Sequence, residues 1–375
     1  MEKNIITNRQ LMIATAGFVY GIAPLRTPSG VTALAGRDSW ISAILAGIAG
    51  LAFIWLYTTL GELYQGKTLI ESILLVFGKV VGSIICIFYI FNALIIAAQV
   101  VWHVGDFLTT VYVPEGSFYT INLVFVAVAV IALLYGLEAL ARSNEIIFII
   151  IFFLFIFSMV LVLTKIKPYN LLPIMENGVL PVIKGSIPIF GYAIWPLIFI
   201  NMIYPANIQN IKKAKRSIYK GYLIGMFIVF VSIIMNVLVF GSNNTANLRF
   251  PLFWLTKEIN VGTIFSRIEA VMLFIWLTSN YASALLFYYS CVKGLSQLLN
   301  IENHKRLIIP MGILIAAISE FLFRSVPQQI MWALQVWIPA SAVLGFILPI
   351  IILVAALIRK KTEKQPHKNK KEALQ

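Results

Sequence analysis

Ionisable side chains inside apolar segments are the first residues of this sequence whose types suggest chemistry. Arg26 lies in the first apolar segment, Asp106 in the third, and Glu269 near the start of the eighth. Charged groups are costly in an apolar medium, so they are candidates for function by default. All three fall near the expected outer ends of their segments. They either form a charged network or are satisfied by one another and by water, and Arg26 either reaches outward or pairs with Glu269 or Asp106.

The histidines and cysteines show no arrangement that predicts catalysis or metal binding. The three histidines have no carboxylate or cysteine at metal-ligand spacing, and the two cysteines, Cys86 and Cys291, form no such spacing either. The sequence contains no glycine-rich phosphate loop and no serine in a nucleophile elbow. We therefore expect no enzymatic activity, no cofactor and no metal.

Backbone groups of the first apolar segment are stronger candidates for binding chemistry. The stretch Gly17-Phe-Val-Tyr-Gly-Ile-Ala-Pro-Leu-Arg-Thr-Pro-Ser-Gly30 places three glycines and two prolines where a plain helix is expected. Inside a helix, Gly costs about 1 kcal/mol and Pro about 3 kcal/mol relative to Ala. We predict a break at Gly21, Ile22, Ala23 and Pro24. Freed N–H groups suit a carboxylate and freed carbonyls suit an ammonium, so the break predicts a small zwitterion such as an amino acid. Ligands of similar polarity, or ordered water, also fit.

A second interrupted segment lies in the other half of the chain. Pro188-Ile-Phe-Gly-Tyr-Ala-Ile-Trp-Pro196 supplies Tyr192 and Trp195 as candidate ligand-binding residues. Matched interruptions in two halves predict an inverted repeat that binds its ligand near the midplane of the membrane. The alternative is that Gly and Pro are simply frequent in membrane helices. Polar residues of the third and eighth segments either line the cavity or pack helices together: Asn92, Gln99, Ser279, Asn280, Tyr281 and Ser283.

Membrane-spanning helices must position these groups. The 375 residues are 60% hydrophobic and 12% charged, with a mean hydropathy of +0.90, which is typical of a polytopic membrane protein. We predict an all-α integral membrane domain over residues 1–358, with ten transmembrane helices as a 5+5 inverted repeat (10–164 and 183–358) and broken helices one and six. Each span needs about 20 apolar residues. The expected spans are 10–34, 39–63, 79–111, 118–137, 144–164, 183–207, 218–241, 264–298, 306–323 and 329–358.

The distribution of charge predicts the orientation. With both ends inside, the inner segments hold 20 of the 29 Lys and Arg residues, which favours cytoplasmic N- and C-termini. Arg249 is among the residues expected in outer loops. The net charge of +14 reflects basic segments beside spans, so we expect contact with membrane lipid and not with nucleic acid. Residues 359–375 are expected to form a disordered basic cytoplasmic tail.

Three short motifs together resemble the GerAB-type spore germination permeases, a family of spore germinant receptor B subunits in the APC superfamily. Ala35-Gly-Arg-Asp-Ser-Trp-Ile-Ser42 follows the first span, and Tyr169-Asn-Leu-Leu-Pro-Ile-Met-Glu-Asn-Gly-Val-Leu-Pro181 precedes the sixth. Arg267-Ile-Glu-Ala-Val-Met-Leu-Phe-Ile-Trp276 begins the eighth. With Gly21-Ile-Ala-Pro24, the resemblance covers essentially the whole chain. It implies a LeuT/APC-like fold in the inner membrane of a bacterial spore, and a complex with A and C receptor subunits.

The resemblance also implies a ligand pocket for a small nutrient, usually an amino acid. By local motif it carries over to Gly21, Ile22 and Ala23 in span one, Asn92 and Ile96 in span three, and Ser283 and Phe287 in span eight. In span six, relatives often have a glycine–acid pair where this chain has Tyr192-Ala-Ile-Trp-Pro196, which leaves the ligand and proton coupling open.

Three functions are compatible with these expectations. The chain is a nutrient-sensing subunit, an amino-acid permease with or without ion coupling, or a structural subunit with a vestigial pocket. The resemblance favours the sensing subunit, because a transporter fold alone does not distinguish among them.

Overall fold

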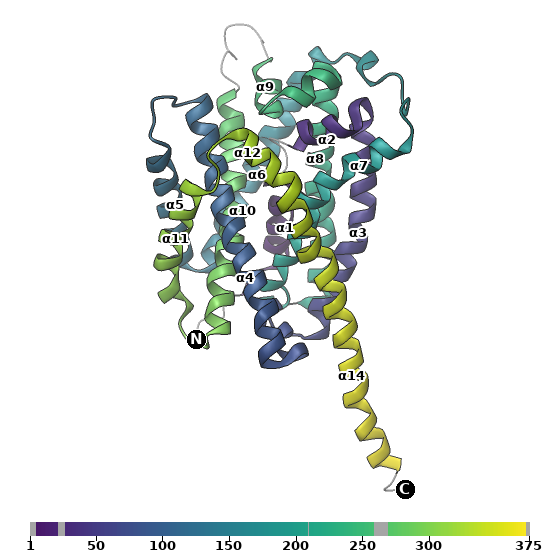
Figure 1. Cartoon of the computed structure of the whole chain (residues 1–375), viewed down its shortest axis with the longest axis vertical. Coiled ribbons are helices and arrows are strands. Elements are labelled where there is room, and N and C mark those ends of the chain that lie inside the picture. The colour runs from purple at the N-terminus through teal and green to yellow at the C-terminus, as the bar shows by residue number, and fades with distance from the viewer. Residues whose placement is uncertain (1–4, 22–26, 209, 259–268, 373–375) are drawn as a thin grey trace.

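Helices make up nearly all the regular structure of this chain (Figure 1). The computed structural model describes residues 5–21, 27–208, 210–258 and 269–372, with side chains described up to Lys360 except that of Glu269. Within these ranges one isolated parallel β-bridge joins Ile6 to Ile208. The amino-terminal half contains α1 (Asn8–Gly21), α2 (Thr27–Ala35), η1 (Gly36–Asp38), α3 (Ser39–Leu63), α4 (Leu69–Val111), α5 (Phe118–Tyr135), α6 (Leu137–Val162), η2 (Leu163–Lys165) and η3 (Pro168–Leu171). The carboxy-terminal half contains α7 (Val179–Ile189), η4 (Phe190–Ile194), η5 (Trp195–Met202), α8 (Ile211–Asn247), α9 (Pro251–Lys257), α10 (Glu269–Leu298), η6 (His304–Leu307), α11 (Ile308–Phe321), α12 (Val326–Trp332), η7 (Ala333–Trp337), α13 (Ile338–Ala342), η8 (Val343–Ile347) and α14 (Leu348–Glu372).

Eight helical segments of the described chain are long and apolar enough to cross a membrane. The predicted all-α membrane architecture is therefore confirmed. The expected spans 10–34 and 306–323 are not among the eight, because α1 and α11 have only 14 residues each. In addition, α2 continues through η1 into α3 as the single segment Thr27–Leu63. The count of ten helices and the 5+5 repeat stay predictions.

Two glycines explain where long helices change direction. Gly78 (φ 74°) interrupts α4, and Gly241 (φ 76°) interrupts α8. A positive φ is disfavoured for residues with a Cβ, so glycine is the residue that permits these kinks. The expected span 79–111 begins next to Gly78, and the expected span 218–241 ends at Gly241. Each span therefore continues as a further helical piece beyond its kink.

The two interrupted segments differ in what the structure describes. Helix α1 ends at Gly21 and α2 begins at Thr27. The predicted break residues Ile22, Ala23 and Pro24, together with Arg26, lie outside the described residues. In the second segment the backbone stays helical, but its hydrogen bonding changes from α in α7 to π in η4 and 3-10 in η5. Pro196 at the start of η5 has no N–H, and such a missing donor forces a change of hydrogen-bond pattern.

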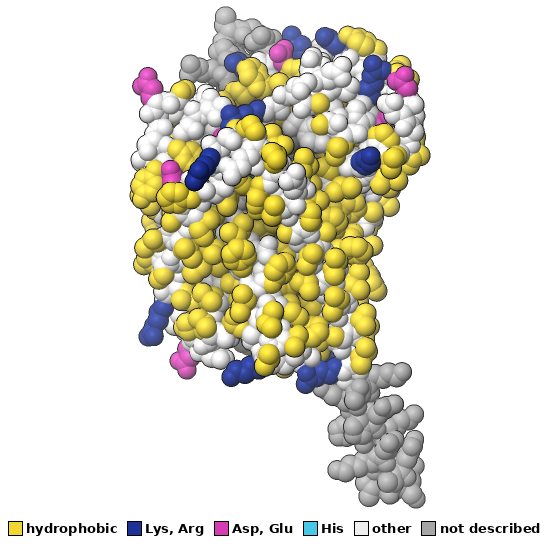
Figure 2. Space-filling view, viewed as in Figure 1, with side chains coloured by type: hydrophobic (Ala, Val, Ile, Leu, Met, Phe, Trp, Pro, Cys, Tyr) yellow, Lys and Arg dark blue, Asp and Glu magenta, His cyan; other side chains and the backbone are white. Residues whose placement is uncertain are grey.

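The core lies where α1 packs against α8 and α10, and α10 against α4. Hydrophobic side chains cover the middle of the visible face in Figure 2, with charged side chains mainly towards its two ends. At the end where α14 leaves the bundle, the Lys360 Nζ donates to the Leu63 carbonyl at 2.7 Å, and the Lys215 Nζ lies 3.1 Å from a Glu62 carboxylate oxygen. Residues predicted to be cytoplasmic therefore meet at one end. Helix α14 runs to Glu372, and the prediction of a separate disordered tail stays a prediction.

Candidate ligand-binding site

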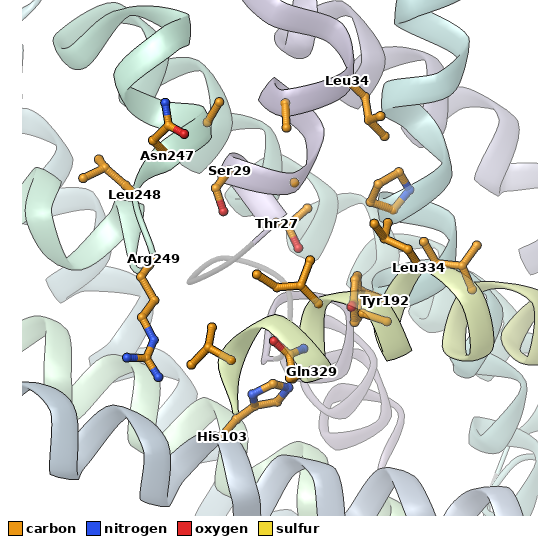
Figure 3. A pocket seen from close by; sticks show the side chains of 18 of the residues that line it. Thr27, Ser29, Leu34, His103, Tyr192, Asn247, Leu248, Arg249, Gln329 and Leu334 are labelled. Atoms are coloured by element: carbon orange, nitrogen blue, oxygen red, sulfur yellow. The ribbon is translucent and has the colours of Figure 1, made fainter. Parts of the chain in front are cut away.

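A cavity of about 440 Å³ opens among helices from both halves of the chain (Figure 3). Its walls come from α2, α4, α7, η4, α10 and the α12–α13 segment, and from the end of α8 and the residues that join α8 to α9. Its lining residues are Thr27, Ser29, Gly30, Ala33, Leu34, His103, Pro188, Tyr192, Ala246, Asn247, Leu248, Arg249, Trp276, Asn280, Val326, Gln329, Ile330, Ala333, Leu334 and Ile338. This volume lies within the range of small-molecule sites, and the lining is mostly apolar with a few polar groups, as such sites require.

A narrow recess adjoins the cavity at Tyr192 and His103, which line both spaces. The recess measures about 10 Å³, close to the volume that holds one water molecule. It is also lined by Ile96, Gln99 and Trp337. The Gln99 Nε2 and the Trp337 Nε1 are buried there without a hydrogen-bond partner in the described part of the chain. Buried donors that lack partners are uncommon in proteins. These two N–H groups are therefore available to donate hydrogen bonds to a molecule in the recess.

Some of the predicted site residues line the cavity or the recess, and others pack in the core beside them. Tyr192 lines the cavity and the recess, and Ile96 lines the recess. Gly21 and Ser283 lie together, since a Cβ at Gly21 would be 2.1 Å from the Ser283 Oγ. Phe287 is fully buried between Phe18 and Phe199, with ring centroids 5.1 and 5.4 Å away.

The other predicted residues face elsewhere. Asn92 is buried and donates from its Nδ2 to the Phe88 carbonyl at 2.8 Å, within its own helix. Trp195 does not line the cavity and stacks on Phe190 at 5.5 Å. Ser283 and Phe287 follow Asn280 by one and two turns of α10, and their packing leaves them outside the lining of the cavity. Whether any of these residues binds a ligand stays a prediction.

The charged candidates are partly described. Asp106 forms an ion pair with Arg249, from the segment that joins α8 to α9. Arg26 lies outside the described residues, and the side chain of Glu269 is not described. The proposed partners of Arg26 therefore stay untested.

Sequence reasoning did not assign Arg249, Trp276 or Gln329 to the cavity that they line. Trp276 was recognised only as part of a motif. Asn280 was named as a polar residue that either lines the cavity or packs helices together, and the structure places it in the lining. The dipeptide Gln328-Gln329 was a usable signal, because it puts amides at the start of an apolar segment. Nothing in the sequence links Arg249 to Asp106, which lies 143 positions away.

Among the described residues of the cavity lining, Arg249 is the only Lys, Arg, Asp or Glu, and it is paired with Asp106. The described part of the chain also contains no cluster of three His, Cys, Asp or Glu side chains that could hold a metal ion. The cavity thus offers hydrogen bonding, apolar contact and a cation.

Sequence comparison identifies relatives over nearly the full length. The profile of the family described as "Spore germination protein" matches residues 5–325. The chain is 27% identical to spore germination protein KB of Bacillus subtilis (strain 168), over 96% of this chain and 97% of that protein. It is 24% identical to spore germination protein YndE of the same organism, over 96% and 98% of the two chains.

Structure comparison identifies transporters with the same fold. Mhp1, a nucleobase-cation-symport-1 family transporter in a closed conformation with bromovinylhydantoin bound, matches with a TM-score of 0.70. The match covers 92% of this chain and 78% of Mhp1 at 14% identity. MhsT in complex with L-phenylalanine matches with a TM-score of 0.67, over 93% of this chain and 97% of MhsT at 13% identity. At these identities the matches show the fold alone.

Proposed function

The chain belongs to the spore germination protein family, and from that premise we propose that it is a nutrient-sensing membrane subunit of a spore germinant receptor. Its ligand is a small zwitterion, chiefly an amino acid, which binds in the cavity of about 440 Å³. The observation that carries this proposal is that cavity, built by helices from both halves of a fold shared with solute transporters. Near full-length matches to spore germination proteins favour sensing over other roles.

The chemistry of the lining supports an amino acid as the ligand. Asn280 and Gln329 place side-chain amides at the cavity, and Arg249 adds a cation. Trp276 and Tyr192 provide aromatic surface for an apolar side chain. A few oriented polar groups within an apolar wall give such a site its specificity. The proposal keeps the residues that the sequence predicted to bind the ligand. We expect the ligand to contact them only after the surrounding helices move apart: Gly21, Asn92, Ile96, Ser283 and Phe287.

The same proposal includes the helix repeat, the side of the membrane on which the termini lie, the membrane itself and the partner subunits. The matched interruptions of the segments Gly17–Gly30 and Pro188–Pro196 support a repeat of five plus five helices over 10–164 and 183–358. The basic residues that meet at the α14 end support cytoplasmic termini, by the positive-inside rule. The protein then resides in the spore inner membrane and assembles with A and C receptor subunits.

Amino-acid transport is the second candidate, because the similar structure of Mhp1 is that of a transporter with bromovinylhydantoin bound, and the similar structure of MhsT is a complex with L-phenylalanine. Purified protein in liposomes distinguishes the two functions. Each of the twenty common amino acids is tested for thermal stabilisation, since a ligand at 100 times its Kd stabilises by about 2.7 kcal/mol. The best binder is then labelled and tested for uptake. Saturable binding without uptake supports sensing, concentrative uptake supports transport, and binding of none of them contradicts both.

A further inference from the structure

Arg249 has an unusual position for a residue of an outer connecting segment. It follows the end of α8 at Asn247, two residues before α9 begins at Pro251, yet its side chain reaches the cavity. Figure 3 shows it extending from this segment towards α4, on the side of the cavity opposite Tyr192 in that view. Its side chain is 33% exposed, so it is partly accessible while most of it is covered.

Neighbouring side chains hold the guanidinium in place. Its Nη2 donates to an Asp106 carboxylate oxygen, and the Asp106 side chain is only 10% exposed. The Phe250 ring lies 5.2 Å from the Arg249 Cζ, and Phe250 itself packs edge-on against Phe107 at 4.9 Å. Asp106 and Phe107 are consecutive residues of α4, so one turn of that helix supports both the charge and the aromatic platform. The guanidinium is pre-organised before any ligand arrives.

The ion pair leaves hydrogen-bonding capacity unused. A guanidinium has five N–H donors in a planar fork, and the bond to Asp106 uses one of them. The Arg249 Nε is buried and has no hydrogen-bond partner in the described part of the chain. The other lining residues that the structure describes include no carboxylate that could compete for these donors. A planar oxyanion matches the geometry of the fork, and apolar walls strengthen the attraction by lowering the local dielectric.

We propose that Arg249 anchors the carboxylate of the ligand in the cavity of about 440 Å³, with Asp106 holding the guanidinium in position until the ligand arrives. This inference rests on the proposed function, since it names the chemical group that the same cavity recognises. It assigns the ligand class as small carboxylates with an apolar body. Trp276, Tyr192 and the aliphatic wall of Leu334 and Ile338 then receive the rest of the ligand.

Two variants that break the same ion pair separate charge recognition from structural support. Arg249→Gln removes the cation, so binding of a carboxylate should weaken. Asp106→Asn keeps a side-chain oxygen that can accept from the Arg249 Nη2 and so hold it in position, but it removes the negative charge that competes with the ligand. Binding of the same carboxylate should therefore strengthen or stay unchanged. A purely structural role for the pair would weaken binding in both variants. Lys257→Gln is the matched control, because Lys257 is a cation of the neighbouring α9 that packs on Trp254 at 4.7 Å and does not line the cavity.

The experiment measures equilibrium binding to the full-length protein in lipid nanodiscs. The two probes are the best-binding amino acid of the twenty-member screen and its carboxamide, which keeps the ammonium and side chain but loses the negative charge. In Arg249→Gln the amino acid should bind about 10-fold more weakly or worse, as expected from a lost charge-assisted hydrogen bond. The carboxamide should change less than about 2-fold in Arg249→Gln, and Lys257→Gln should match the wild type for both probes.

Other outcomes overturn the inference. Equal losses for the amino acid and the carboxamide in Arg249→Gln would show a structural role, as would a loss in Asp106→Asn of the same size. Unchanged amino-acid binding in Arg249→Gln would place the carboxylate elsewhere while leaving the proposed function intact. If the wild type binds none of the twenty amino acids, the proposed function itself fails, and the anchor with it. Melting temperatures of all variants, measured without ligand, identify any variant that is misfolded. Arg249→Lys then tests whether a cation alone preserves the preference for the amino acid over its carboxamide.

Discussion

Replacing Gly21 with alanine tests how closely the end of α1 packs against α10. A Cβ at Gly21 would lie 2.1 Å from the Ser283 Oγ and 2.7 Å from the Ser279 carbonyl oxygen, both inside the 3.0 Å that real Cβ atoms respect. The Ser283 hydroxyl can rotate away, but the Ser279 carbonyl belongs to the backbone of α10 and cannot. Gly21→Ala therefore forces the two helices apart.

The expected cost follows from that geometry. Adding a methyl group to a closely packed site typically destabilises by about 1–3 kcal/mol. For a chain of this size we expect a melting temperature lower by roughly 1–4 °C. Gly17→Ala is the matched control in the same helix, because its Cβ would find its nearest neighbour, the Asn144 Nδ2, at an ordinary 3.9 Å. That variant should be neutral or stabilised by up to about 1 kcal/mol, the helix preference of Ala over Gly.

Thermal unfolding of the purified protein in detergent, followed by tryptophan fluorescence, measures both variants. Adding Ser283→Ala to Gly21→Ala removes the hydroxyl contact but keeps the carbonyl contact, so it should restore part of the loss. A Gly21→Ala protein as stable as the wild type, or an equal loss in Gly17→Ala, would refute the proposed contact between α1 and α10.

Two further predictions concern other parts of the fold. Tyr57→Phe removes the hydroxyl that donates to the Gly345 carbonyl at 2.6 Å, so unfolding should be easier by about 1 kcal/mol, with unchanged stability as the contrary result. Partial burial, with Lys293 and Lys305 nearby, lowers the pKa of His304 in the loop before α11. The unfolded chain then binds more protons than the folded one as pH falls through the ordinary histidine range, so the wild type should lose stability between about pH 7 and pH 5. The melting temperature of the wild type minus that of His304→Gln should decrease on acidification across that range, and a constant difference would count against this account.

The sequence predicted the long apolar helices well, because run length and composition are local properties. The residues near 79 and 241, where expected spans began and ended, are next to the kinks at Gly78 and Gly241. What could not be read from the sequence is that the helix continues past each kink, since glycine marks an end and a bend equally well.

The candidate site was predicted less completely, because a cavity depends on which side chains from distant helices meet. Tyr192 lines it as expected, but Trp195, three residues further on, points towards Phe53 and Phe190 after the change to 3-10 geometry. Period-based reasoning assumes one helix type and fails where the hydrogen bonding changes. Arg249 was expected in a solvated outer loop, and only the tertiary contact with Asp106 brings it to the cavity.

Filling the cavity tests most directly the claim that this space binds the ligand. Gly30 lines the cavity, and a Cβ added there would meet nothing within 4 Å, so a large side chain should be accommodated without disturbing the fold. The measurement is equilibrium binding of the best-binding amino acid to wild type, Gly30→Ala and Gly30→Trp, with melting temperatures recorded in parallel. We predict that Gly30→Trp loses binding while its melting temperature stays within about 2 °C of the wild type, and that Gly30→Ala binds normally. Wild-type binding by a stably folded Gly30→Trp protein would contradict the assignment of the cavity as the ligand site.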